Sequence, residues 1–193
     1  MMASDEYKRQ FEPVFTSDVR FSRTFARHAN AIVIRNLVEI NDHEKRLTEE
    51  DCIKDSEGKD RSFSVPKTSY GVRVRRSKWV QKAEFTMDTK EWENSTNPDY
   101  YVFGYADISE KELLFHMLWD QRQFLKLAKP GKIKHGIEQN KDHSLVLFLT
   151  FKLTDIYDQC DILECGGNSP ETIREILGDN SQCFQKSKLG EYQ

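Results

Sequence analysis

The sequence reads TEEDCIKDSEGKD at 48–60, RSFSVPKTS at 61–69, YGVRVRRSKW at 70–79, AEFTMD at 83–88 and NPDYYVFGYAD at 97–107. The first segment gathers acidic residues around a glycine turn, and short runs typical of β-strands follow it. In YGVRVRR, valines and arginines alternate, which predicts a strand with the valines on one face and the arginines on the other. YYVFGYA is apolar on both faces, as is typical of a central strand.

Two helical patterns flank these strands. Between Phe21 and Ile40, apolar residues recur at three- and four-residue steps, which predicts a buried helix. Ser109 and Glu112 have the spacing of a capping box, and an apolar stripe follows them as far as Pro130–Gly131. We therefore expect a long second helix over residues 109–129.

The C-terminal part adds one strand and one short helix. SLVLFLTFK at 144–152 predicts a buried strand, and Ser169-Pro170-Glu171 begins a helix that extends to Leu177, with proline at its first position. The order of elements predicts an α/β or α+β domain with a single mixed sheet flanked by helices. We expect an N-terminal arm over 1–20, one domain over 21–178 and a polar tail over 179–193.

The composition indicates a globule with a heavily charged surface. Hydrophobic residues make up 37% of the chain and charged residues 32%, with a net charge of −3, so a nucleic-acid-binding face would have to be a local patch. MMASDEYKRQ at the start does not resemble a signal peptide, and no apolar run approaches the roughly 18 residues that span a membrane. We expect a cytoplasmic protein that does not enter membranes. The cysteines, whose spacing suits no metal site, are then expected to be reduced thiols: Cys52, Cys160, Cys165 and Cys183.

Asp60 and the pair Arg73 and Arg75 are the first candidates for chemistry. An acid at the start of one strand and cations at alternate positions of the next strand can converge on one face of a sheet. Metal-dependent phosphodiester cleavage uses such convergence. Carboxylates hold Mg²⁺, the metal polarises the phosphate and activates water, and a cation offsets the developing charge.

The order of these pieces resembles the PD-(D/E)xK nuclease family, which includes many restriction enzymes. Gly58-Lys59-Asp60 matches the first motif and Arg73-Val74-Arg75 the second, while the helix at 21–40 stands where the family has its first helix. NPDYYVFGYAD at 97–107 resembles a later core strand, so the resemblance covers about residues 21 to 128. It implies a restriction-endonuclease-like core, hydrolysis of DNA with Mg²⁺ or Mn²⁺, and a homodimer, because many such nucleases need two subunits to cut both strands.

The resemblance also assigns roles. Asp60 is the expected central metal ligand, with Asp55 as a candidate second ligand. Arg75 is expected to stabilise the pentavalent phosphate, and Arg73 and Lys78 to hold the backbone. The family has an acid at the position of Arg73, and a guanidinium cannot ligate a metal. This departure favours the first alternative, a non-catalytic nucleic-acid-binding module on the same fold. The second alternative is a protein–protein interaction or inhibitory factor.

A basic cluster supports contact with DNA. Cations and one aromatic residue crowd a short stretch, and they can neutralise phosphates and stack on a base: Arg73, Arg75, Arg76, Lys78, Trp79 and Lys82. The plainer interpretation is a solvated strand whose arginines pair with Glu84 and Asp88 across the sheet. The basic loop at 129–141 could also touch a phosphate backbone, although an ordinary surface loop is the favoured interpretation there.

Overall fold

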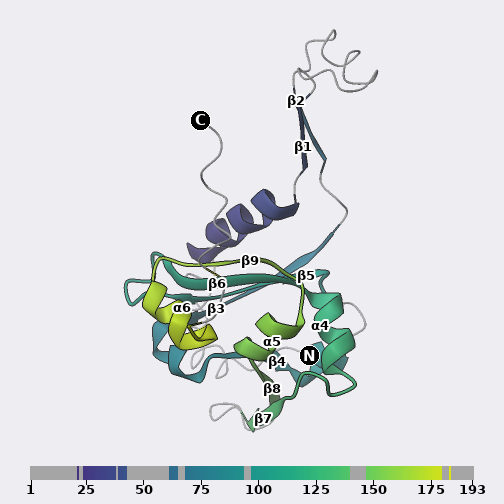
Figure 1. The fold of residues 1–193 in the computed structure, drawn as a ribbon, viewed down its shortest axis with the longest axis vertical. Coiled ribbons are helices and arrows are strands. Elements are labelled where there is room, and N and C mark those ends of the chain that lie inside the picture. The colour runs from purple at the N-terminus through teal and green to yellow at the C-terminus, as the bar shows by residue number, and fades with distance from the viewer. Residues whose placement is uncertain are drawn as a thin grey trace, which may run out of the picture.

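Figure 1 shows the computed structural model of the chain, which describes residues 21, 24–37, 39–42, 61–64, 68–93, 97–139, 147–179 and 183. The described strands form sheets of two, four and three strands, with helices packed against them. The mixed α/β class is confirmed, but the strands are divided among separate sheets instead of forming the single sheet that we expected. The restriction-endonuclease-like core stays a prediction.

The four-stranded sheet is the centre of the fold. It has the order β3 (Tyr70–Arg76), β5 (Tyr100–Ala106), β6 (Leu113–Asp120) and β9 (Ile162–Gly166). β3 is parallel to β5, and the other two neighbouring pairs are antiparallel. The predicted strand at 70–75 is confirmed, and so is the central position of YYVFGYA, since β5 has a partner on each side.

The three-stranded sheet is antiparallel, with β8 (Leu147–Lys152) between β4 (Glu84–Asp88) and β7 (Gly136–Gln139). The predicted strands at 83–88 and 144–152 are confirmed. β7 lies in a segment that we expected to be a loop. The short helix α3 (Thr89–Glu93) directly follows β4.

A helix over residues 24–37 covers one face of the four-stranded sheet (Figure 1). Phe25, Ala29 and Ile32 are buried there, and they pack with Val102 of β5 and Leu118 of β6. The three- and four-residue steps thus place one stripe of the helix on the sheet, as the sequence predicts. The expected helix ends earlier than Ile40, because β1 (Glu39–Asp42) begins at Glu39.

An aromatic core fills the other face of the same sheet. Phe85 of β4 lies at its centre, with its ring edge-to-face with those of Phe103, Trp119 and Phe124. The helices on this side are α4 (Gln121–Ala128), α5 (Leu153–Gln159) and α6 (Pro170–Leu177). The prediction of α6 is confirmed: Pro170 begins it, and the Ser169 hydroxyl accepts a hydrogen bond from the Thr172 amide.

The prediction of a long helix over 109–129 is wrong for the first half of that range. Residues 113–120 form β6, and only 121–128 are helical. Phe115, Met117 and Trp119 alternate along β6 and are buried in one core, so the hydrophobic period of two residues, typical of a strand, determines the structure here. In place of a helix cap, the carboxylate of Asp107 accepts hydrogen bonds from the amides of residues 111 and 112 and closes a turn.

One pair of strands lies apart from the two larger sheets. β1 pairs with β2 (Arg61–Ser64) in a two-stranded ribbon that extends away from the sheets (Figure 1).

Cys165 of β9 forms a disulfide with Cys183, and both are buried. The expectation of reduced thiols is therefore wrong for this pair, whereas Cys160 is free and buried and Cys52 lies outside the described residues. Among the described helices, none is both long and apolar enough to cross a membrane.

Candidate nucleic-acid interface

Arg73 lies on the face of β3 that points toward the three-stranded sheet. Its guanidinium donates to the carbonyl oxygen of Thr86, and its Nη2 lies 3.0 Å from a carboxylate oxygen of Glu91. The guanidinium carbon is 5.7 Å from the centre of the Phe85 ring. Its ion-pair partner is thus Glu91, neither Glu84 nor Asp88, and the side chain joins β3 to β4 and α3.

Arg75 lies two residues along on the same face. Its Nη2 donates to the Thr86 hydroxyl at 2.9 Å, so β4 receives hydrogen bonds from both arginines. Burial lowers the pKa of Arg75, although the nearby Tyr105 acts in the opposite direction. Both arginines that were expected from the sequence to contact a phosphate therefore already make hydrogen bonds within the protein.

The metal ligands expected from the sequence, Asp60 and Asp55, lie outside the described residues. The strand that follows Asp60, β2, pairs with β1 and not with β3. Across the part of the chain that the structure describes, no group of three histidine, cysteine, aspartate or glutamate residues could hold a metal ion. Glu91, the carboxylate beside Arg73, also accepts a hydrogen bond from the Tyr101 hydroxyl. Binding of Mg²⁺ or Mn²⁺ by Asp60 and Asp55 therefore stays a prediction.

Trp79 forms the centre of a cationic and aromatic surface. It lies on the 3₁₀ helix η2 (Ser77–Lys82), which directly follows β3 and is anchored by the buried Val80. Trp79 is 41% exposed. Cationic groups surround its ring: Lys78 and Lys82 have their Nζ atoms 5.5 Å from the ring centre, and the guanidinium carbon of Arg75 is 5.9 Å away. We call these four residues the Trp79 surface.

The positive charge of this region is partly neutralised. Lys82 forms an ion pair with Glu138 of β7, with Nζ–Oε distances of 2.7 and 2.9 Å. Arg76 forms one with Glu110 at 2.7 Å and lies over the ring of Phe21. Within the described ranges, Arg75 and Lys78 are the cations of this predicted cluster that have no carboxylate at ion-pair distance. The structure thus gathers Arg75, Lys78 and Lys82 around Trp79, although Arg75 also donates to Thr86. Arg73 and Arg76 are held by Glu91 and Glu110.

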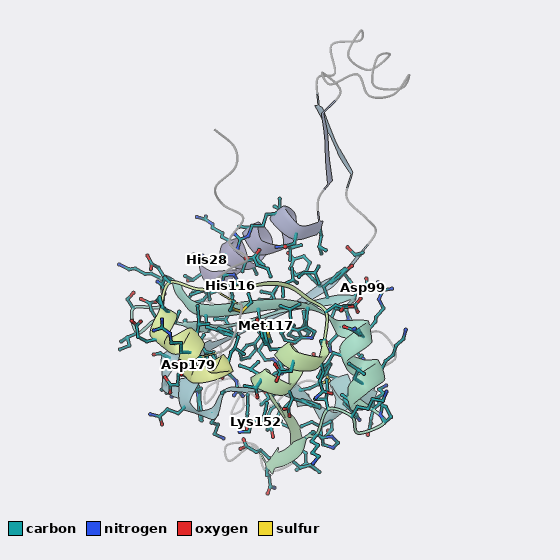
Figure 2. The ribbon with its side chains drawn as sticks, in the orientation of Figure 1. His28, Asp99, His116, Met117, Lys152 and Asp179 are labelled. Atoms are coloured by element: carbon teal, nitrogen blue, oxygen red, sulfur yellow. A yellow bond between two sulfur atoms is a disulfide. The ribbon has the colours of Figure 1, made fainter. Side chains whose placement is uncertain are left out.

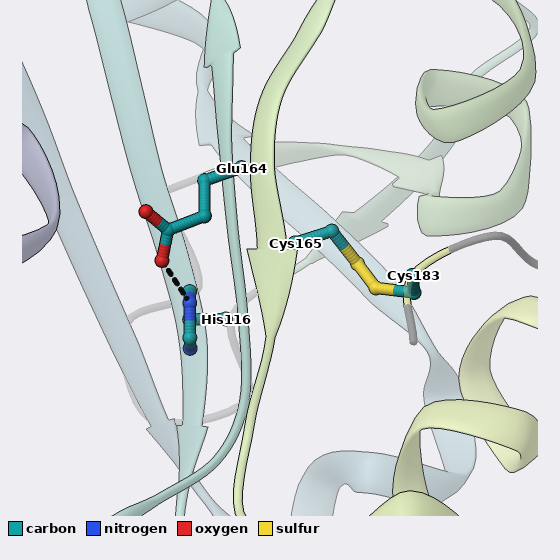
Figure 3. The surroundings of a disulfide bond; sticks show 4 residues. All are labelled: His116, Glu164, Cys165 and Cys183. Carbon is teal, nitrogen blue, oxygen red and sulfur yellow. Dashed lines mark hydrogen bonds and ion pairs between the residues drawn. A yellow bond between two sulfur atoms is a disulfide. The ribbon is translucent and has the colours of Figure 1, made fainter. Parts of the chain in front are cut away.

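A second polar cluster, which sequence reasoning missed, surrounds Glu164 of β9. Its carboxylate accepts hydrogen bonds from the Arg35 guanidinium, the Asn36 amide and Nε2 of His116, the last at 2.7 Å (Figure 3). Burial favours a raised pKa for Glu164, but these hydrogen bonds outweigh it and the pKa falls to about 2. The cluster fastens the end of the 24–37 helix to β6 and β9.

The sequence holds no signal for this cluster, because Arg35 and Glu164 are 129 residues apart and His116 is 48 residues from Glu164. A carboxylate that fixes one histidine nitrogen is an arrangement used in catalysis. Glu164, however, is already saturated by hydrogen bonds from the helix and β6. Figure 2 shows His28 and His116 on the helix side of the sheet, and His28 contacts the carbonyl oxygen of Lys111. We therefore assign the Glu164 cluster a structural role.

No protein-family model, curated protein or solved structure matches this chain. The functional conclusion consequently depends on the geometry of the Trp79 surface.

Proposed function

We propose that the chain is a nucleic-acid-binding module that contacts a single strand through the Trp79 surface. The observation that carries the proposal is an exposed indole with three cationic side chains within 6 Å of its ring centre. An exposed aromatic ring offers a flat face to an unpaired base, and nearby cations neutralise the adjoining phosphates. In duplex DNA the bases are stacked on each other, so a single strand suits this surface better.

Glu138 limits the charge of the surface. Its carboxylate holds Lys82, so one cation beside Trp79 is neutralised in the absence of a ligand. A phosphate that binds Lys82 has to compete with this ion pair. Because both partners are well exposed, with 39% and 47% of their side chains accessible, the ion pair is weak enough for that competition.

The test is fluorescence anisotropy of a short, labelled single-stranded DNA of mixed sequence, titrated with the protein over a range of NaCl concentrations. Trp79→Ala removes the stacking ring, and we expect it to weaken binding by about tenfold, since base–aromatic stacking contributes about 1–3 kcal/mol. Glu138→Gln releases Lys82, and we expect tighter binding with a steeper salt dependence, by about 0.7 in the slope of log K against log salt.

Tyr70→Ala is the matched control. Tyr70 is an aromatic residue of similar exposure, 38%, but its hydroxyl contacts Asn30 on the helix side of β3. Its loss should leave the affinity for the oligonucleotide within twofold of the parent. Equal weakening by Trp79→Ala and Tyr70→Ala, or unchanged binding in Trp79→Ala, would contradict the proposal.

Mg²⁺- or Mn²⁺-dependent hydrolysis of DNA stays a separate prediction, because its ligands Asp60 and Asp55 lie outside the described residues. The same oligonucleotide, incubated with each metal, tests it in the parent and in Asp60→Ala. Cleavage that the substitution abolishes would extend the function from binding to catalysis. A cytoplasmic location also stays a prediction, and the disulfide weighs against it because disulfides are rare in that compartment.

A further inference from the structure

The segment from Gln121 to Ile137 carries five cations and no carboxylate, in a chain whose net charge is −3. It consists of α4, the loop that follows α4, and the start of β7. A local excess of one sign in an acidic chain produces a positive potential that attracts polyanions. The fold determines where these cations lie on the surface.

Helix α4 and its C-cap residue, Lys129, carry three of the cations on the solvent side. The carboxylate of Asp120 caps its N-terminus by accepting a hydrogen bond from the Gln123 amide, and Phe124 and Ala128 are buried against the core. Arg122, Lys126 and Lys129 are exposed and follow one another at steps of four and three residues. They therefore line one side of the helix over about 10 Å, the length of about three nucleotides of a strand in a duplex.

The loop after α4 holds two more cations in fixed positions. Gly131 has a φ of 81°, which reverses the chain, and the amides of Lys132 and Ile133 return to the carbonyl oxygen of Leu127. Ile133 is fully buried, so it anchors the loop, while Lys132 and Lys134 on either side of it are exposed. The lysines are thus presented by a packed turn.

Four of these five cations form no ion pair with a described residue. Arg122 lies 3.4 Å from Asp99, but no carboxylate in the described part of the chain lies at ion-pair distance from Lys126, Lys129, Lys132 or Lys134. Favourable interaction with the helix dipole accounts for lysines in the last turn of α4. It does not account for Lys132 and Lys134, which lie beyond the end of the helix.

An aromatic group adjoins the lysines. The Nζ atom of Lys129 is 5.8 Å from the centre of the Trp92 ring on α3, and the His135 ring is also 5.8 Å from that of Trp92. Over residues 121–137, Ile137 at the end of the segment is the single described residue whose large apolar side chain is exposed. A membrane-binding surface normally combines its cations with several such side chains, so this composition favours a nucleic-acid backbone over a lipid surface.

We propose that Lys126, Lys129, Lys132 and Lys134 form a second nucleic-acid contact, which binds phosphates without reading bases. This inference rests on the proposed function and extends it. The Trp79 surface stacks on a base, and this lysine surface holds backbone. Its contribution should be sensitive to salt and indifferent to base sequence.

The test compares two double variants of equal charge in the anisotropy assay with single-stranded DNA. Lys126→Gln with Lys132→Gln removes two cations from the lysine surface. Arg27→Gln with Lys111→Gln removes two exposed cations from the 24–37 helix and the β5–β6 turn, away from α4 (Figure 1). We expect the first variant to bind on the order of tenfold more weakly at about 0.1 M salt, with a salt slope smaller by about 1.4, and the control to stay within twofold.

Equal weakening in the two variants would show a general effect of net charge and overturn the inference, as would unchanged binding in Lys126→Gln with Lys132→Gln. Should Trp79→Ala lose binding while this lysine variant keeps it, the lysine surface fails and the proposed function stands. Absence of oligonucleotide binding in the parent refutes both. Vesicles containing phosphatidylserine serve as a parallel probe, and binding to them without binding to DNA would also overturn the inference.

Discussion

Replacement of Glu164 by glutamine should weaken the polar contacts that hold the 24–37 helix on the sheet, without changing the shape of the side chain. Glu164 receives hydrogen bonds from Arg35 and Asn36 on the helix and from His116 on β6. Glutamine keeps one acceptor oxygen but loses the charge. Arg35 and His116 then lose their anionic partner, so we expect the folded state to be destabilised.

The pKa of Glu164 gives the magnitude. It falls from an ordinary value of 4.5 to about 2 in the fold, and each pKa unit corresponds to about 1.4 kcal/mol, so the ionised carboxylate contributes about 3 kcal/mol at neutral pH. The side chain of Glu164 is 14% exposed, whereas that of Arg35 is 43% exposed and can regain water. We therefore expect Glu164→Gln to lower the free energy of unfolding by about 2–3 kcal/mol.

Urea unfolding at several pH values, followed by the fluorescence of the buried Trp119, measures this loss. Because the pKa is lower in the fold, the contribution is fully present above pH 4.5 and is lost as the pH falls toward 2. The difference between parent and variant should shrink over that range. Glu110→Gln is the control, since the ion pair of Glu110 with Arg76 is about 40% exposed and should contribute less than about 1 kcal/mol. A loss no larger than that of Glu110→Gln, or a difference independent of pH, would refute the reasoning.

Two further predictions concern β9 and the turn after it. Cys183→Ser should lower the free energy of unfolding by about 3 kcal/mol in urea titrations without reductant, because the disulfide closes a loop between residues 18 positions apart. The same titrations with reductant should bring the parent to the level of the variant, and a parent unaffected by reductant would count against this. Gly167→Ala should lower the free energy of unfolding by more than about 2 kcal/mol in the same urea titrations, because a Cβ there would overlap the backbone of Leu114 and Phe115. A free energy of unfolding equal to the parent's would contradict it.

The strands and helices whose hydrophobic residues recur with a clear period could be predicted from the sequence. β3, β4, β5 and β8 show alternation or continuous apolar runs, and α6 has its serine cap and first-turn proline. β6 could not be predicted, because LLFHMLWD fits three- and four-residue steps as well as alternation. Pairing with β5 and β9 on both edges decided in favour of a strand.

The candidate site was predictable only in part. The basic character of residues 73–82 is visible in the sequence, and so is Trp79, but the partners that neutralise these cations come from distant segments. Glu91 holds Arg73, Glu110 holds Arg76 and Glu138 holds Lys82, at separations of 18, 34 and 56 residues. Lys129, Lys132 and Lys134 were recognised as part of a basic loop, but Lys126 was not, and the lack of carboxylate neighbours of these lysines within the described residues is a property of the fold.

The most direct test of the account is the affinity of the parent protein for a short single-stranded DNA, measured by anisotropy from low to moderate salt. The account predicts binding whose log K falls linearly with log salt, because lysines displace counterions from phosphates. Absence of binding at the lowest salt concentration, or binding that does not change with salt, would contradict the assignment of this protein as a nucleic-acid-binding module.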